Sequence, residues 1–195
     1  MSAPNVVMIV LDDLGFAQLG CYGADIATPN IDLLADGGLR YNGFHVTSLC
    51  GPTRASLLTG RNHHAVGMGI GPEVPMRFPG YTGRIPKSAG TLPRLLRDAG
   101  YSTLAVGKWH LTPRFERTQA GPFEHWPLGL GFERYYGFLG GMTDQLLRLK
   151  ELALSASNDT LTAEDRVTIG TEVAQIREQL LGLANTRDAD GITIE

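Results

Sequence analysis

Three short segments of this 195-residue chain contain residue types that bind ions or supply a nucleophile. They are Asp12-Asp13, the run from Cys50 to Arg61, and the run that holds Lys108 and His110. Carboxylates are preferred ligands of hard divalent cations, a cysteine can furnish a nucleophile, and arginine and lysine bind oxyanions. These residue types predict an anion site beside a cation, provided that the fold brings the segments together.

The acidic pair Asp12-Asp13 directly follows an apolar run, Val6 to Leu11, that Pro4 bounds on its other side. A continuous apolar run of this length is typical of a strand buried on both faces of a parallel sheet. Ligand crevices in open α/β sheets lie beyond the carboxyl ends of the strands, and two adjacent carboxylates are costly to bury without a cation. The pair is therefore a candidate site for Ca²⁺ or Mg²⁺, and a solvated turn is the alternative.

The run Cys50-Gly51-Pro52-Thr53-Arg54 predicts the start of a helix, because proline suits a first helical turn and Gly60 can end the helix. Cys50 would lie just before the helix N-terminus, where free amide groups and the helix dipole favour an anion. Arg54 lies four residues further on, so its guanidinium can bind an oxyanion on the same side. The alternative is that Cys50 is an ordinary buried thiol.

A second strand is predicted over Ser102 to Val106, after a helix from about Leu92 to Ala99 that closes at Gly100. The order of strand, helix and strand predicts an α/β sandwich. If the second strand continues in extended form, Lys108 and His110 project from one side and Trp109 packs on the other. Surface residues around a buried tryptophan are the alternative interpretation.

The block from Cys50 to Arg61 resembles the signature of type I sulfatases, in which a maturation enzyme oxidises the cysteine of a Cys-x-Pro-Ser/Thr-Arg motif to formylglycine. Thr53 stands where serine is more usual and keeps the hydroxyl group. The resemblance implies that the hydrated aldehyde at position 50 attacks sulfur and releases the alcohol, then collapses to the aldehyde and expels sulfate. It also implies that Asp12, Asp13 and Cys50 bind a divalent cation, Ca²⁺ ahead of Mg²⁺.

Three further segments resemble parts of the same family. The resemblance of Gly107 to Leu111 implies that Lys108 binds sulfate and the formylglycine hydroxyl, and that His110 holds this hydroxyl. Residues 28–32 are expected to open a helix, and residues 131–138 to form a turn. The implied fold is a mostly parallel alkaline-phosphatase/sulfatase-like sandwich. The implied partners are a small sulfate ester, with an aryl sulfate as the expected substrate, and the formylglycine-generating enzyme.

The composition changes near residue 145, because every aromatic residue lies at or before Phe138 and every proline at or before Pro127. The resemblance to sulfatases also stops at Gln145, before the strands that supply further metal ligands and catalytic residues in the family. We therefore expect two domains, an incomplete sulfatase catalytic portion over residues 1–145 and a helical tail over residues 146–195. The chain would then be a truncated sulfatase portion joined to a foreign segment.

The tail is predicted to form a helical hairpin, with a first helix over about residues 146–157. Thr162 is the expected N-cap of the second helix, with Asp165 three residues later. The second helix carries apolar residues at alternating spacings of four and three, which is typical of a helix that packs along a partner helix: Ile169, Val173, Ile176, Leu180 and Leu183. The tail also resembles helices of flagellin-like hook-associated proteins, and an ordinary coiled-coil hairpin is the alternative.

Composition limits the partners of the chain. Seventeen basic residues against 20 acidic ones give a net charge of −3, which provides no basic surface for nucleic acid or for an anionic membrane. Two cysteines imply no disulfide framework, and the N-terminus has no signal-peptide pattern, so a cytoplasmic location is expected. Two alternative functions remain, phosphate or phosphonate ester hydrolysis on the same fold, and a non-enzymatic assembly role with self-association through the tail.

Overall fold

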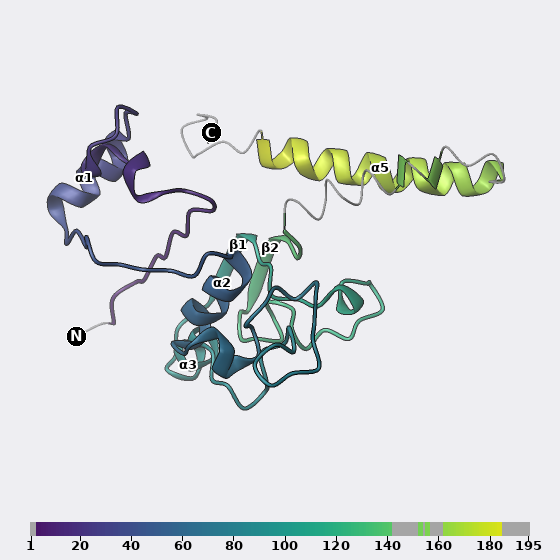
Figure 1. The fold of residues 1–195 in the computed structure, drawn as a ribbon, viewed down its shortest axis with the longest axis horizontal. Coiled ribbons are helices and arrows are strands. Elements are labelled where there is room, and N and C mark those ends of the chain that lie inside the picture. Colours follow the sequence, from purple (N-terminus) through teal and green to yellow (C-terminus); the bar gives the residue numbers. More distant parts are fainter. Residues whose placement is uncertain (1–2, 142–151, 154, 157–161, 185–195) are drawn as a thin grey trace. The chain divides into compact units, whose positions relative to one another are not determined.

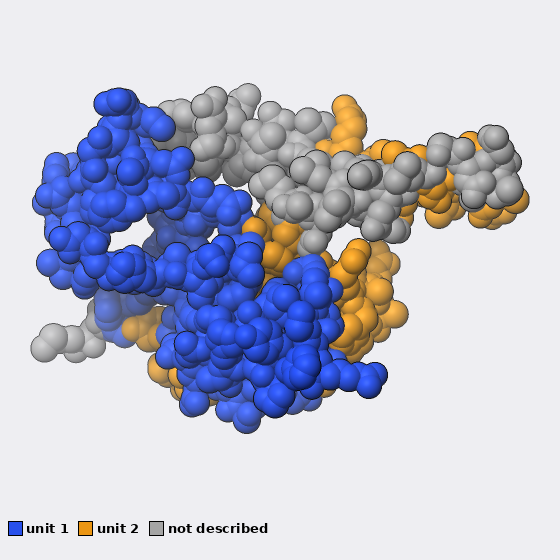
Figure 2. Space-filling model, viewed as in Figure 1, with its two compact units in different colours: residues 1–92 blue, residues 93–195 orange. Residues whose placement is uncertain are grey.

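The computed structural model describes residues 3–141, 152–153, 155–156 and 162–184 (Figure 1). The chain divides into two compact units, residues 1–92 and residues 93–195 (Figure 2). The first unit contains η1 (Phe16–Gln18), η2 (Gly20–Tyr22), α1 (Pro29–Gly37), α2 (Cys50–Thr59) and η3 (His63–Val66). Helix α3 (Leu92–Asp98) begins at the division and is followed by β1 (Leu104–Lys108), η4 (Arg114–Glu116), β2 (Arg134–Phe138) and α5 (Ala163–Ala184).

The N-terminal apolar run does not form the buried strand that the sequence predicts. Residues Val6 to Leu11 carry no strand assignment, and the exposed fraction of these six residues ranges from 40% at Val10 to 84% at Val7. An extended segment becomes a strand only when a neighbouring strand pairs with its backbone. In the part of the chain that the structure describes, the only sheet is the pair formed by β1 and β2, so the run stays unpaired.

Helix α1 begins where the sequence predicts, with Pro29 as its first residue and Thr28 as its N-cap. The Thr28 hydroxyl accepts a hydrogen bond from the Gly20 backbone N–H at 2.9 Å and donates one to Asp32 Oδ1 at 2.8 Å. One side chain therefore connects the start of η2 to the first turn of α1.

The sheet of the second unit is parallel, as the sequence predicts for an α/β fold. Strands β1 and β2 lie side by side, and Leu104 pairs with Arg134 at one end of the register and Lys108 with Phe138 at the other (Figure 1). Strand β1 begins two residues later than expected, after α3 has ended and Gly100 has turned the chain at φ 89°. The expected turn over residues 131–138 is confined to its first part, because its aromatic second half pairs with β1.

The tail contains the predicted capped helix. Helix α5 runs over 22 residues, and Thr162 and Asp165 form a reciprocal cap in which Asp165 N–H donates to the Thr162 hydroxyl at 3.2 Å and Thr162 N–H donates to Asp165 Oδ2 at 3.1 Å. A further hydrogen bond from the Thr162 hydroxyl is the main reason that the pKa of Asp165 lies below its ordinary value. Ile169 and Val173 are half-buried and Ile176 is buried, as the predicted apolar stripe requires, although Glu172 is half-buried as well.

The first predicted tail helix lies largely outside the described residues. The described positions 152–153 and 155–156 are helical, Leu152 is buried, and Arg166 of α5 donates a hydrogen bond to the Ala156 carbonyl at 2.9 Å. This bond joins the two helical segments, as expected of a hairpin. Among the residues that the structure describes, no helix combines the length and the apolar character that crossing a bilayer requires.

Candidate active site

Cys50 is the first residue of helix α2, one position further into the helix than the sequence predicts. Leu49 is the N-cap and contributes no side-chain hydrogen bond, so the amide groups of the first turn face whatever lies beyond the helix end. Helix α2 ends at Gly60, which adopts φ 65° and whose N–H donates to the Ser56 carbonyl at 2.8 Å. The predicted helix boundaries are therefore correct to within one residue.

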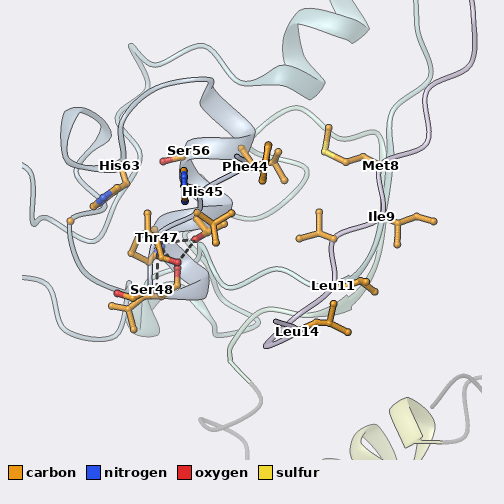
Figure 3. Close-up of a pocket in the computed structure, with 17 residues that line it drawn as sticks. Met8, Ile9, Leu11, Leu14, Phe44, His45, Thr47, Ser48, Ser56 and His63 are labelled. Atoms are coloured by element: carbon orange, nitrogen blue, oxygen red, sulfur yellow. Dashed lines mark hydrogen bonds between the residues drawn. The ribbon is translucent and has the colours of Figure 1, made fainter. Parts of the chain in front are cut away.

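The hydroxyl of Thr53 fixes the start of α2 to the chain that enters it. The Thr47 and Thr53 hydroxyl oxygens lie 2.7 Å apart, and the Thr53 hydroxyl also donates to the Thr47 carbonyl at 3.2 Å. The Thr47 hydroxyl in turn donates to the Leu49 carbonyl at 2.7 Å (Figure 3). The residue type at position 53 therefore has a structural consequence, because its hydroxyl holds the segment directly before Cys50.

Arg54 contacts the predicted metal ligand Asp12. Arg54 Nη2 lies 3.5 Å from Asp12 Oδ1, and the side chains are 14% and 26% exposed, respectively. Arg54 is also one helical turn beyond Cys50 on the same helix. Within the first unit, the structure thus brings together the Cys50 motif and one of the two carboxylates expected to hold a cation.

The acidic pair offers part of a ligand set for a divalent cation. Asp13 is exposed and has φ 53°, a conformation that aspartate adopts more readily than most residues. No group of three histidine, cysteine or acidic side chains that could hold a metal ion occurs within the described residues. Ca²⁺ takes six to eight oxygen ligands and Mg²⁺ about six. The carboxylates of Asp12 and Asp13 fit such an ion chemically but would need further ligands.

A cavity of about 1000 Å³ lies beside α2 in the first unit (Figure 3). The exposed N-terminal run forms one wall, including Met8, Ile9 and Leu11, and residues 44–49 with one side of α2 form the other. The lining is mainly apolar, with hydroxyl groups from residues such as Thr47 and Ser56. The cavity therefore contains few groups suited to holding a charged substrate.

Lys108 and His110 lie at the end of β1 in the second unit. Trp109 N–H donates to the Phe138 carbonyl at 3.0 Å and His110 N–H to the Leu139 carbonyl at 3.1 Å, so pairing continues past the strand. The predicted alternation is present, since Trp109 is buried and its two neighbours are half-buried. The extended form nevertheless ends at Trp109, because His110 adopts φ 58°, in the left-handed region.

Sequence reasoning missed a buried polar network that contacts Trp109. Glu116 of η4 accepts hydrogen bonds from His125, and the His125 carbonyl accepts one from the Trp109 indole N–H at 2.9 Å. Glu116 is 2% exposed and His125 is 7% exposed. The only sequence signal was an acidic residue and a histidine nine positions apart in a region rich in tryptophan and proline, which does not specify a contact.

Comparison with known proteins identifies the family. The sequence model of the sulfatase family matches residues 4–168, which is most of the chain. The chain therefore belongs to the sulfatase family.

Curated relatives agree with this assignment. Arylsulfatase A of Homo sapiens is 44% identical over 136 residues, which cover 69% of this chain and 25% of that protein. Arylsulfatase of Klebsiella aerogenes is 34% identical over 148 residues, which cover 72% of this chain and 29% of that protein. The chain spans about a quarter of the length of the curated relatives that it matches.

A solved structure confirms the fold class. The crystal structure of Ps i-CgsB superposes with a TM-score of 0.61 at 35% sequence identity, and the similarity covers 82% of this chain and 34% of that one. The predicted α/β, sulfatase-like fold with a parallel sheet is therefore correct. The two-domain division at residue 145 and the flagellin-like tail stay predictions.

Proposed function

We propose that the chain is part of a sulfuric ester hydrolase of the arylsulfatase type, in which Cys50 is converted to formylglycine. The observation that carries this proposal is the placement of Cys50 as the first residue of α2, with Arg54 one turn further on and in contact with Asp12. An anion at this helix end would meet backbone amides and a guanidinium from one helix. The arylsulfatases among the relatives support sulfate esters as the substrate class.

The hydrated aldehyde at position 50 would supply two hydroxyl groups on one carbon, one to attack sulfur and one whose collapse to the aldehyde expels sulfate, which no standard side chain offers. The proposed role of Arg54 is to bind the sulfate oxygens, because a guanidinium forks onto two oxygens of a tetrahedral anion. The α2 amides would add to this attraction without reorganising, since the helix already fixes their direction. Thr53 would keep residue 50 in place through its bonds to Thr47.

Lys108 and His110, which lie at the end of β1, are proposed as further residues of a sulfatase site. Lys108 would bind sulfate and the formylglycine hydroxyl as a point charge, and His110 would hold this hydroxyl. Their half-buried position at the end of a strand suits both roles, because a partly dehydrated charge attracts an anion more strongly than an exposed one. Their placement as site residues rests on the family resemblance.

A divalent cation, Ca²⁺ in the first instance, is proposed to bind Asp12 and Asp13 together with residue 50. When bound, the ion would polarise the sulfate and lower the charge repulsion between substrate and carboxylates. Asp12 would then be shared between the ion and Arg54, which lies 3.5 Å away.

The substrate class is tested by comparing matched aryl sulfate and aryl phosphate esters, with the full chain co-expressed with the maturation enzyme. We expect kcat/KM to be at least about 100-fold higher for the sulfate ester than for the phosphate ester. This ratio corresponds to about 2.7 kcal/mol of differential transition-state stabilisation. A chain with Cys50→Ala is the control for contaminating hydrolases. A faster reaction with the phosphate ester would favour the alternative of phosphate or phosphonate hydrolysis.

The tail is proposed as a separate helical element that packs along a partner helix. The capped helix α5, its partly shielded apolar stripe and the bond from Arg166 to Ala156 support this role. Self-association through the tail is the corresponding second function, and it requires no catalytic chemistry.

A further inference from the structure

A buried carboxylate in the second unit has two hydrogen bonds to one residue. Glu116 Oε1 lies 2.7 Å from His125 Nδ1, and Glu116 Oε2 accepts from the His125 backbone N–H at 3.1 Å. Because the ring and the backbone of His125 are held by the two oxygens of one group, the peptide plane before His125 and the orientation of its ring are both fixed.

The next step of the network is the carbonyl of His125. It accepts a hydrogen bond from Trp109 Nε1–H at 2.9 Å and another from the Thr112 hydroxyl at 2.9 Å. Thr112 is fully buried, and Trp109 is 6% exposed. One carbonyl therefore holds the residues on both sides of the short stretch that contains His110.

This stretch needs such support because of its backbone conformation. A histidine at φ 58° occupies the left-handed region, which costs on the order of 1 kcal/mol and persists only when the surroundings enforce it. The Trp109 ring is also held edge-on by Phe132, with ring centroids 5.9 Å apart and an interplanar angle of 83°. Backbone hydrogen bonds from Trp109 to the Phe138 carbonyl and from His110 to the Leu139 carbonyl also hold this stretch.

From these contacts we propose that Glu116 is a positioning residue, which sets the direction of Lys108 and His110 through the His125 carbonyl and Trp109. The inference rests on the proposed function in one respect, namely that Lys108 and His110 bind sulfate. Burying a carboxyl group and its partner is often no more stabilising than burying apolar residues of similar volume. The network is therefore better explained by the direction that it imposes on the chain than by stability.

The test uses the full chain with Glu116→Gln, which keeps the shape but replaces one acceptor oxygen by a donor. Thr112→Val is a second variant, because it removes one of the two donors to the His125 carbonyl and leaves Glu116 unchanged. Thr103→Val is the matched control. It also loses one buried hydrogen bond, from the Thr103 hydroxyl to the Gly131 carbonyl at 3.1 Å, but lies outside the network.

Two readouts are followed by NMR during a titration with inorganic sulfate. The first is the indole N–H resonance of Trp109, which is the one of the two indole signals in this chain that Trp109→Phe removes. The second is the sulfate affinity measured from the His110 ring resonance. We expect Glu116→Gln and Thr112→Val to shift the Trp109 indole signal and to weaken sulfate binding about tenfold, since a small misplacement of binding groups has a large effect. Thr103→Val should change the affinity less than about twofold.

Each outcome decides the proposal. An unmoved Trp109 indole signal in Glu116→Gln, or a loss of sulfate affinity no larger than in Thr103→Val, would overturn it. If the unaltered chain does not bind sulfate, the proposed function fails, and the positioning role is then judged by amide hydrogen exchange at His110. About tenfold faster exchange in Glu116→Gln but not in Thr103→Val would support it, and equal exchange would overturn it.

Discussion

Replacing Arg54 with alanine is expected to weaken the binding of inorganic sulfate by about 100-fold or more. The guanidinium is only 14% exposed, so its charge acts with little screening by water. Removing one donor from a preorganised oxyanion hole typically lowers kcat by a factor of about 100 to 1000, and we expect the loss of a charged donor to weaken sulfate binding comparably. Arg54→Lys should recover part of the affinity, because lysine restores the charge without the planar fork.

The affinity is measured by calorimetric titration of the full chain with sulfate. Arg77→Ala is the matched control, because Arg77 lies in the same unit and is exposed, and its removal changes the net charge equally. The loss of the Arg54 partner should also destabilise the first unit by about 1 kcal/mol, since Asp12 is left partly buried. Sulfate affinity within twofold of the unaltered chain would contradict the proposed role of Arg54.

Replacing Trp109 with alanine is expected to lower the free energy of unfolding of the second unit by about 3–5 kcal/mol. The side chain is 6% exposed, contacts the rings of Phe132 and Tyr135, and donates its indole hydrogen bond to a buried carbonyl. Trp109→Phe keeps most of the ring contact and loses the hydrogen bond. It should therefore lower the free energy of unfolding by about 1 kcal/mol more than the smaller ring alone would.

Amide hydrogen exchange in β1 and β2 measures this effect within the second unit. Tyr136→Ala is the matched control, because Tyr136 lies on β2 and is 82% exposed. Its removal should cost no more than about 1 kcal/mol. A cost for Trp109→Ala as small as that of Tyr136→Ala would show that the tryptophan does not anchor the end of β1.

Local patterns in the sequence were sufficient to predict the boundaries of α2 and the start of α5. The boundaries of α2 follow from Pro52 and Gly60, and the start of α5 follows from Thr162 and Asp165, because caps and turn residues act over a few positions. The parallel character of the sheet was predictable from the α/β pattern, but β2 was not, because residues 131–138 were expected to form a turn.

Features that depend on distant partners could not be predicted. The run from Val6 to Leu11 has the composition of a buried strand, but burial requires a neighbouring strand that the run itself does not specify. The left-handed conformation of His110 occurs beside a bond from Trp109 to His125, which joins residues 16 positions apart. The network of Glu116 and His125 depends on the fold for the same reason.

In the proposed function, conversion of Cys50 to formylglycine is what makes this a sulfatase site. The mass of the tryptic peptide over residues 41–54 tests this conversion most directly. After co-expression of the full chain with the maturation enzyme, we expect this peptide to carry an aldehyde in place of the thiol. Cys21, in the peptide over residues 1–40, is the internal control and should remain a thiol. An unmodified thiol at Cys50 under conditions in which a known sulfatase is converted would contradict the assignment.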